Sequence, residues 1–372
     1  MNFLMVISII LIAVIIFDHI GKNGIRILRK LEFTLSLPGV PILLSFVHGL
    51  QIALGYTELV KYLLTFTERF EGPSRFIVGT DMYVVLTKPE DYKSVLSNTN
   101  GNYKSSATIL WQSLLGDGII RVSVTFAGIE ETAQKGDYDD VLHWQKRLFK
   151  LTYDRSIRPW LYADKTYSIT GNAKQMRFGL NILESFIYNV HIDIEQRPEL
   201  VFLEQLFENV VDRNDVTDQD FKDDIKNLYL AAQSTMTELT HFVLLMLAMH
   251  PEIQDTLRKE ISTLDNETIN SSCLLRMRYL HMVIKETLRL FPIAPLMVRE
   301  LTGDIKLESC TLPDGCYVMV PIYAIHRNPK YWDHPNEFIP ERFAPENSLN
   351  HNRDAYLPFG SGIRSCPGKH PS

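Results

Sequence analysis

The feature that most constrains this 372-residue chain is a glycine-rich loop around one cysteine near its C-terminus. The loop, Phe359–Gly368, reads Phe-Gly-Ser-Gly-Ile-Arg-Ser-Cys-Pro-Gly, so Cys366 is surrounded by Gly360, Gly362 and Gly368. Glycine permits tight, positive-φ turns, which allow a backbone to curl around a sulfur atom and aim N–H groups at it. A thiolate that binds iron needs such hydrogen bonds, because they tune the metal. The alternative is a glycine-rich turn that carries a free cysteine.

Composition limits the classes of protein to which the chain can belong. Hydrophobic residues make up 45% of the sequence, enough to bury a large core in one big domain or two smaller ones. The net charge is −6, and no long basic run follows the N-terminal region, so nucleic-acid binding has no electrostatic support. Four cysteines are too few for a disulfide scaffold and indicate a reducing compartment.

Two of those cysteines, Cys310 and Cys316, flank Pro313-Asp314-Gly315, a combination typical of a tight turn. We predict a β-hairpin over this segment, in which the two thiols are incidental. The alternative is a disulfide or a pair of metal ligands.

The N-terminus carries an apolar run from Phe3 to Phe17, interrupted by a single serine. The run is short for a membrane span, and a cleaved signal peptide is the competing interpretation. No basic residue precedes the run, and no small-x-small cleavage site follows it. Positive charge comes directly after it, at Lys22, Arg26, Arg29 and Lys30. This order favours a retained signal anchor that leaves the rest of the chain in the cytosol.

The pattern of apolar residues predicts a mainly α protein with a small β region. From about Asp218, apolar residues recur at three- and four-residue steps, which is typical of a long amphipathic helix. The other predicted elements are a hairpin of Phe76–Thr80 with Met82–Leu86, and helices over Lys88–Ser97, Pro251–Leu264 and Tyr279–Leu290.

The loop around Cys366 resembles the cysteine loop of the cytochrome P450 family, F-x-x-G-x-R-x-C-x-G, at every fixed position. The resemblance implies that Cys366 is the axial thiolate ligand of the iron of haem b, and that Arg364 pairs with a haem propionate. Arg299, within Pro295–Arg299, resembles the other propionate-binding arginine of the family. The resemblance also places three further residues at the cofactor: Phe359, Gly362 and Gly368.

A second motif, in the helix predicted before residue 290, agrees with this resemblance. Glu286 and Arg289 are three residues apart and share one face of that helix, where an ordinary surface ion pair is the alternative. They resemble the E-x-x-R of the family, and Asn336–Phe343 resembles its meander. The resemblance implies that Arg342 joins them in a buried charge network with a structural role. His326 lies in another family-like segment, and taken by itself we predict it to be a structural histidine as well.

A third motif is less complete. The spacing within the long helix places Ala231–Met236 where the family carries A-G-x-[D/E]-T-[T/S]. Thr235 matches the threonine that assists oxygen activation, while Ser234 replaces the acid that relays protons. A serine hydroxyl donates and accepts hydrogen bonds but supplies no acidic proton. The alternative is that Thr235 lines the helix without a catalytic part.

The sequence departs from the family pattern in two places. Ile119–Ser123 stands where family members have a helix with W-x-x-x-R, so a helical segment is missing there. Trp144 and Arg147 have the wrong spacing for that motif, and we do not assign them to the haem. The chain also ends at Ser372, where relatives continue with a helix behind the haem. We therefore expect the 372-residue form to bind haem weakly and to turn over slowly.

The resemblance covers most of the chain and has a microsomal, insect-type and family-4-like character. It implies an incomplete cytochrome P450 fold with an N-terminal membrane anchor helix. We expect a signal-anchor transmembrane helix over residues 1–20, a basic and proline-containing linker over 21–45, and a partial catalytic domain over 46–372.

The function implied by the resemblance is a haem-thiolate monooxygenase that oxidises a small lipophilic substrate, such as a fatty acid, hormone, steroid or xenobiotic. NADPH would supply electrons through cytochrome P450 reductase, and the catalytic domain would face the cytosol from the endoplasmic reticulum membrane. That topology leaves the sequons at Asn266 and Asn270 without glycan. The alternatives are a catalytically silent or fragmentary P450-like membrane protein, and a zinc-binding membrane protein, for which no Cys/His set has suitable spacing.

Overall fold

The computed structural model describes residues 24, 26–55, 58–78, 81–101, 103, 139–196, 218–264, 271–347 and 352–369. The predicted anchor, residues 1–20, lies outside this part of the chain, as does the departure from the family pattern near residue 120. No helix among the described residues is both long enough and apolar enough to cross a membrane.

The described part of the chain is mainly α-helical with a small β region, as the sequence predicted. Besides a helix over residues 26–36, the helices are α2 (Ile42–Ala53), α3 (Leu59–Arg69), α4 (Pro89–Leu96), α6 (Asp139–Ser156), α7 (Asp164–Ser168), α8 (Gly171–Gln196), α10 (Asp218–Met249), α11 (Pro251–Ser262), α12 (Ser271–Arg276), α13 (Arg278–Leu290) and α14 (Ile322–Ile325). These bounds confirm the four predicted helices to within two residues at each predicted end: those over 88–97, 251–264 and 279–290, and the long helix that starts at about 218.

Among the described residues, four strands form one mixed sheet in the order β1-β2-β6-β3. The strands are β1 (Ser74–Val78), β2 (Asp81–Val85), β3 (Met297–Glu300) and β6 (Tyr317–Val320). The predicted hairpin is confirmed as the antiparallel pair β1–β2. Strand β6 runs parallel to β2 and antiparallel to β3, so two strands flank it. Its run Val318-Met319-Val320 is buried, as expected of a strand covered on both faces.

The prediction of a hairpin around Pro313-Asp314-Gly315 is wrong. The turn itself forms, because Gly315 has φ 79° and the N–H of Cys316 donates to the carbonyl of Pro313 at 3.2 Å. The strands beside it pair elsewhere, however: β5 (Thr311–Leu312) with β4 (Ile305–Lys306), and β6 with β2 and β3. The apolar β6 gains more by lying inside the larger sheet than by pairing with a two-residue neighbour. Both flanking thiols are free.

The two faces of the sheet pack against different elements. Val84 and Val318 belong to a core shared with α4, α14 and the segment that leads into the cysteine loop. Val85 and Met319, one residue further along their strands, belong to the core under α3. This alternation follows from the two-residue period of a strand. The sheet therefore joins the cysteine loop to the N-terminal third of the chain.

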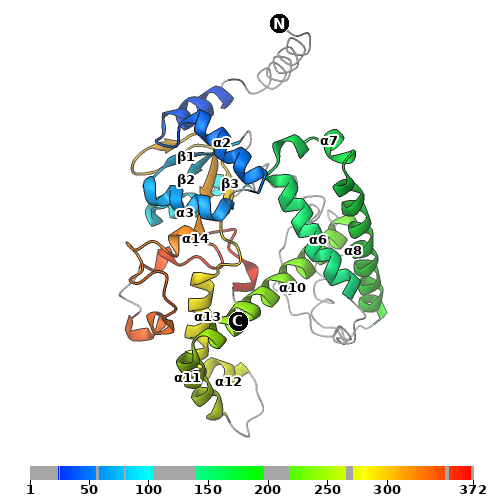
Figure 1. Ribbon diagram of the computed structural model, residues 1–372, viewed down its shortest axis with the longest axis vertical. Coiled ribbons are helices and arrows are strands. Elements are labelled where there is room, and N and C mark those ends of the chain that lie inside the picture. The colour runs from blue at the N-terminus through cyan, green and yellow to red at the C-terminus, as the bar shows by residue number, and fades with distance from the viewer. Residues whose placement is uncertain are drawn as a thin grey trace.

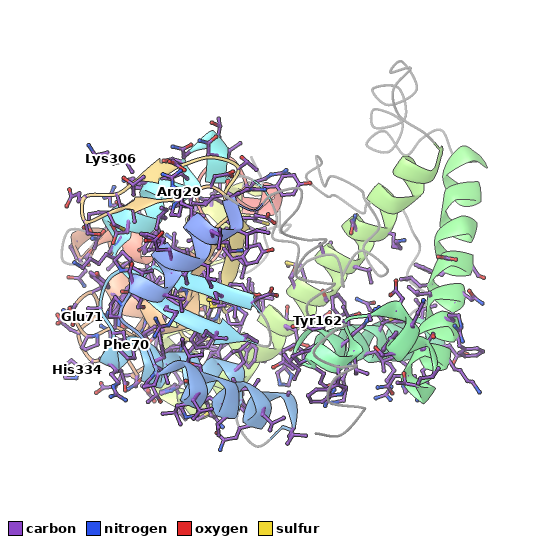
Figure 2. The ribbon with its side chains drawn as sticks, turned by 90° about the horizontal axis from the view of Figure 1, so that it is seen from above. Arg29, Phe70, Glu71, Tyr162, Lys306 and His334 are labelled. Atoms are coloured by element: carbon purple, nitrogen blue, oxygen red, sulfur yellow. The ribbon has the colours of Figure 1, made fainter. Side chains whose placement is uncertain are left out.

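Helix α10 connects the two helical groups of the structure. In its first half, Leu230 packs in the core between α6 and α8, and near its end Met246 packs with α11 and α13. Figure 1 shows α10 running from the pair α6 and α8 toward α13. Tyr162, labelled in Figure 2, follows α6 in the chain. Burial raises the pKa of Tyr162 to about 12, and the negative charge of Asp81 on β2 contributes to the increase, so Tyr162 lies near the sheet.

Residues 26–36, within the segment predicted as a linker, form a helix that packs against the β region. Arg26 binds Asp314 with 2.7 Å between Nε and Oδ2, and Arg29 binds Asp304 with 2.7 Å between Nη2 and Oδ2. The ammonium group of Lys30 lies 3.6 Å from the centre of the Tyr317 ring. Figure 2 shows Arg29 on the side of the molecule where Lys306 of β4 lies. Positive charges after the apolar run thus also bind the folded body.

The shared core between the sheet and the cysteine loop makes a testable prediction. Leu86 is fully buried in it, so Leu86→Ala leaves a cavity and should lower the free energy of unfolding by about 2–5 kcal/mol. The matched control is Leu43→Ala on α2, where the side chain is 80% exposed and the change should stay within about 0.5 kcal/mol. Urea unfolding measures both. Equal losses would show that this core does not carry the fold.

Candidate functional site

The cysteine loop is closed by turns at its glycines. Gly360 and Gly362 have φ values of 70° and 76°, in the left-handed region that favours glycine. The N–H of Cys366 donates to the carbonyl of Phe359 at 2.8 Å, so the chain returns on itself and sets the position of the sulfur. A Cβ atom at Gly362 would overlap the carbonyl of Leu96 at the end of α4. The positive-φ turns predicted at residues 360 and 362 are therefore confirmed.

The prediction fails at Gly368, whose φ lies outside the left-handed region. Residues 367–369 form one turn of 3-10 helix, which any residue type can adopt. A Cβ atom at Gly368 would lie 3.7 Å from Sγ of Cys366, an ordinary van der Waals distance. Neither the backbone conformation nor the surrounding space therefore requires a glycine at position 368. The feature of Gly368 that the structure shows is its position beside the sulfur of Cys366.

Cys366 is an exposed free thiol, while Cys273 and Cys316 are buried and Cys310 is half-buried. Over the described ranges, no three or more His, Cys, Asp or Glu side chains gather where they could hold a metal ion. A single thiolate from the protein is enough to anchor a haem iron.

Two arginines lie close enough to interact near the loop. Arg299 projects from β3 and donates to the carbonyl of Val298 at 2.9 Å, while Arg364 belongs to the loop and is exposed. Burial lowers the pKa of Arg299, and the positive charge of Arg364 lowers it further. Neither arginine has a salt bridge to another residue that the structure describes. An anion bound between these two cations would relieve their repulsion, which is the property required of a haem propionate.

Glu286 and Arg289, both fully buried, form a two-bond pair on one face of α13. Nε and Nη2 of Arg289 lie 2.8 Å from Oε2 and Oε1 of Glu286, respectively. Arg342 approaches Oε1 with its Nε at 3.2 Å, and the N–H of Ile339 donates to the same oxygen at 3.0 Å. The structure therefore brings together the three residues of the expected charge network, and adds a backbone donor that side-chain motifs could not reveal.

The remaining donors of Arg289 bind backbone carbonyls. Its Nη1 donates to the carbonyls of His326 at 2.8 Å and Pro335 at 2.7 Å, and its Nη2 donates to that of Glu337 at 3.0 Å. Every residue has a backbone carbonyl, so the sequence cannot predict which carbonyls accept hydrogen bonds from Arg289. The result is that one guanidinium fastens two separate loop segments to α13.

The start of α13 is fixed by a carboxylate from a neighbouring helix. Glu260 of α11 accepts from the N–H groups of Tyr279 and Leu280 at 2.7 and 3.0 Å. A negative charge at this end satisfies two free N–H groups and complements the helix dipole. Helix α13 is thus held at one end by Glu260 and along its buried face by the network of Glu286.

Thr235 and Ser234 lie on α10, with Thr235 exposed and Ser234 half-buried. Both hydroxyl groups donate within their own helix: Thr235 to the carbonyl of Ala231 at 2.6 Å, and Ser234 to that of Leu230 at 2.5 Å. No described hydrogen bond joins either residue to the cysteine loop. Their roles in oxygen activation stay a prediction.

Trp144 and Arg147, which the sequence analysis did not assign to a cofactor, lie on α6 at its contact with α8. Arg147 donates to Oε1 of Gln175 at 2.9 and 2.7 Å, and the ring of Trp144 meets that of Phe178 edge-on at 5.0 Å. Their contacts join the two helices.

A mainly helical body with one exposed thiol in a glycine-turned loop, two arginines near that loop and a buried Glu–Arg pair has the features of a haem-thiolate protein. The comparisons with known proteins agree with this class. The family model "Cytochrome P450" matches residues 122–370, two thirds of the chain, and its match begins within Ile119–Ser123, where the sequence departs from the family pattern. The chain belongs to the cytochrome P450 family.

Curated relatives match shorter regions. Cytochrome P450 3A6 of Oryctolagus cuniculus is 41% identical over 143 residues, which cover 38% of this chain and 28% of that protein. Cytochrome P450 3A7 of Homo sapiens is 37% identical over 170 residues, 43% of this chain and 34% of that protein. Cytochrome P450 4V2 of Mus musculus is 28% identical over 261 residues, which cover 64% of this chain and 50% of that protein. The chain therefore matches between 28% and 50% of the length of these relatives.

The charge network leads to a prediction about Glu286→Ala. The substitution leaves Arg289 buried without its counter-charge, so we expect a loss of about 3–5 kcal/mol and protein that fails to fold or to hold haem. Asp255→Ala is the matched control, because Asp255 and Arg258 form an i,i+3 pair on the surface, worth less than about 1 kcal/mol. Soluble expression, haem content and thermal unfolding measure the effect. Unchanged haem content and melting temperature in Glu286→Ala would contradict the prediction.

Proposed function

We propose that this chain is a haem-thiolate monooxygenase that oxidises a small lipophilic substrate, of the fatty acid, hormone, steroid or xenobiotic class. The observation that carries the proposal is the loop around Cys366, which matches the family motif and places an accessible sulfur beyond two glycine turns. Haem b, when bound there, supplies the chemistry that activates dioxygen for insertion of one oxygen atom. NADPH would supply the electrons through cytochrome P450 reductase.

The residues present fit a haem group. The exposed thiol of Cys366 would supply the thiolate that binds the haem iron, and the hydrogen bond from its own N–H to the carbonyl of Phe359 holds the loop in shape. Arg299 and Arg364 offer two cations that lack a carboxylate partner in the described chain, which suits the two propionates of the cofactor. Gly362 lets the loop approach the end of α4, where a Cβ atom would overlap the carbonyl of Leu96, and Gly368 lies beside the sulfur.

Thr235 would hold and pass protons during oxygen activation. Its hydroxyl now donates to the carbonyl of Ala231, so it must rotate away from that bond to donate to a bound ligand. Ser234 can relay a proton but cannot supply an acidic one, since a hydroxyl stays protonated at neutral pH. These two residues would set the efficiency of turnover, whereas Cys366 decides whether the cofactor binds as a thiolate complex.

A catalytically silent member of the family is the second candidate. Ser234 favours it, because it stands where an acid would feed protons and its own proton is donated to the carbonyl of Leu230. This candidate would bind haem or ligand poorly and would not couple electron supply to substrate oxidation. Purified protein with reductase and NADPH separates the two: substrate-dependent oxygen consumption supports the monooxygenase, and its absence in haem-loaded protein supports the silent form.

The assignment of Cys366 has a direct test. Cys366→Ser removes the only cysteine in the glycine-rich loop, so the thiolate-type difference spectrum of the reduced protein with carbon monoxide should disappear. Cys310→Ser is the control, because Cys310 is half-buried and lies outside that loop, and its spectrum should match that of the wild type. Retention of the thiolate-type spectrum in Cys366→Ser would refute the assignment.

We also propose that the catalytic domain faces the cytosol from the endoplasmic reticulum membrane, anchored by residues 1–20. The support is the order of the sequence, in which the basic residues follow the apolar run. The sequons at Asn266 and Asn270 should then carry no glycan in cells that glycosylate secreted proteins. A sequon placed on an N-terminal extension ahead of Met1 is the control, since it should reach the lumen and be modified. Glycan at Asn266 or Asn270, detected by a mobility shift that glycosidase reverses, would exclude this topology.

A further inference from the structure

His326 is fully buried, and both nitrogens of its ring have hydrogen-bond partners from distant parts of the chain. Its Nδ1 lies 3.1 Å from the carbonyl oxygen of Arg289, at the end of α13. Its Nε2 lies 2.8 Å from the backbone nitrogen of Leu357, which leads into the cysteine loop. One imidazole therefore bridges the helix that carries the charge network and the segment that carries the cysteine.

The two partners define the protonation of the ring. A carbonyl can only accept, so Nδ1 must carry the proton, and a backbone N–H can only donate, so Nε2 must offer its lone pair. The imidazole is thus neutral with the proton on Nδ1. Burial, which lowers the pKa of His326 to about 3, agrees with this neutral form.

The contact between His326 and Arg289 works in both directions. The guanidinium of Arg289 donates to the carbonyl of His326 at 2.8 Å, while the ring of His326 donates to the carbonyl of Arg289. The same guanidinium holds Glu286 by two bonds. The orientation of the imidazole therefore depends directly on the buried Glu–Arg pair.

Leu357 lies two residues ahead of the loop and takes part in its first turn. Its carbonyl accepts from the N–H of Gly360 at 3.1 Å, which makes the first turn, and the carbonyl of Phe359 inside that turn accepts from the N–H of Cys366. Tyr356 strengthens the same attachment: its ring stacks on that of His326 at 5.5 Å, and its hydroxyl donates to the carbonyl of Lys285 on α13 at 3.0 Å.

We infer that His326 is a positioning residue that couples the buried Glu286–Arg289 pair to the loop of Cys366, by donating to the carbonyl of Arg289 and accepting from the N–H of Leu357. The bond to Leu357 is the one that fixes the loop, because it lies ahead of the first turn. The consequence for a haem ligand rests on the function proposed above, whereas the mechanical coupling does not.

Two substitutions separate the two bonds. In His326→Asn the side-chain nitrogen stands as far from Cα as Nδ1, so it keeps the donor toward Arg289 and loses the acceptor for Leu357. In His326→Gln the side-chain oxygen stands as far from Cα as Nε2, so it keeps the acceptor for Leu357 and loses the donor. Each variant loses one buried hydrogen bond, and the general loss of stability is therefore matched between them.

The first measurement is amide hydrogen exchange at Leu357 in the full chain. Loss of its acceptor in His326→Asn should speed exchange by about tenfold or more relative to His326→Gln, after correction for the global stability of each variant. The second measurement is the reduced carbon monoxide spectrum after haem loading. We expect the thiolate-type band to be retained in His326→Gln and lost in His326→Asn.

Equal exchange at Leu357 in the two variants would overturn the inference, because His326 would then only fill space in the core. Folding of His326→Gln with failure of His326→Asn to fold would support it, and failure of both to fold would overturn it. Unequal exchange in protein that takes up no haem would leave the coupling supported and would refute the proposed function instead.

Discussion

The buried carboxylate of Glu286 is the constraint on which the core of the C-terminal half depends. A charge removed from water is tolerated only when its partners surround it. Glu286 receives two bonds from Arg289, one from Arg342 and one from the N–H of Ile339. These donors come from α13 and from a segment more than fifty residues later. The hydrogen bonds to this one carboxylate therefore fix the position of residues 339–342 relative to α13, although no strand pairing joins these two segments.

The order imposed by this pair reaches the cysteine loop through hydrogen bonds of fixed direction. The other donors of the Arg289 guanidinium bind backbone carbonyls in loops. The backbone carbonyl of Arg289 accepts a hydrogen bond from the ring of His326, and that ring accepts one from the N–H of Leu357. The glycine turns then carry the chain to Cys366. The charge network and the cysteine loop are thus joined by a continuous chain of hydrogen bonds. Neither of the two sequence motifs that contain them predicts this connection.

Local rules read from the sequence succeeded where the relevant neighbours lie within a few residues. The i,i+3 spacing of Glu286 and Arg289 put both on one face of a helix, and the left-handed conformation of Gly360 and Gly362 followed from the residue type. The same reasoning failed around Pro313-Asp314-Gly315. There the turn was correct, but the pairing of β6 depended on β2, more than 200 residues earlier, and no local pattern specifies such a partner.

The sequence by itself determined the family-type loop around Cys366, the mainly helical composition and the candidate charge network, because these are set by residue type and short spacing. The tertiary structure alone decided that Arg26 and Arg29 bind Asp314 and Asp304, and that His326 is neutral and bridges Arg289 to Leu357. The physical reason is that the partner of a charge or a ring nitrogen is whichever group the path of the chain brings within about 3 Å, and residues 31 to 288 positions apart meet only after folding.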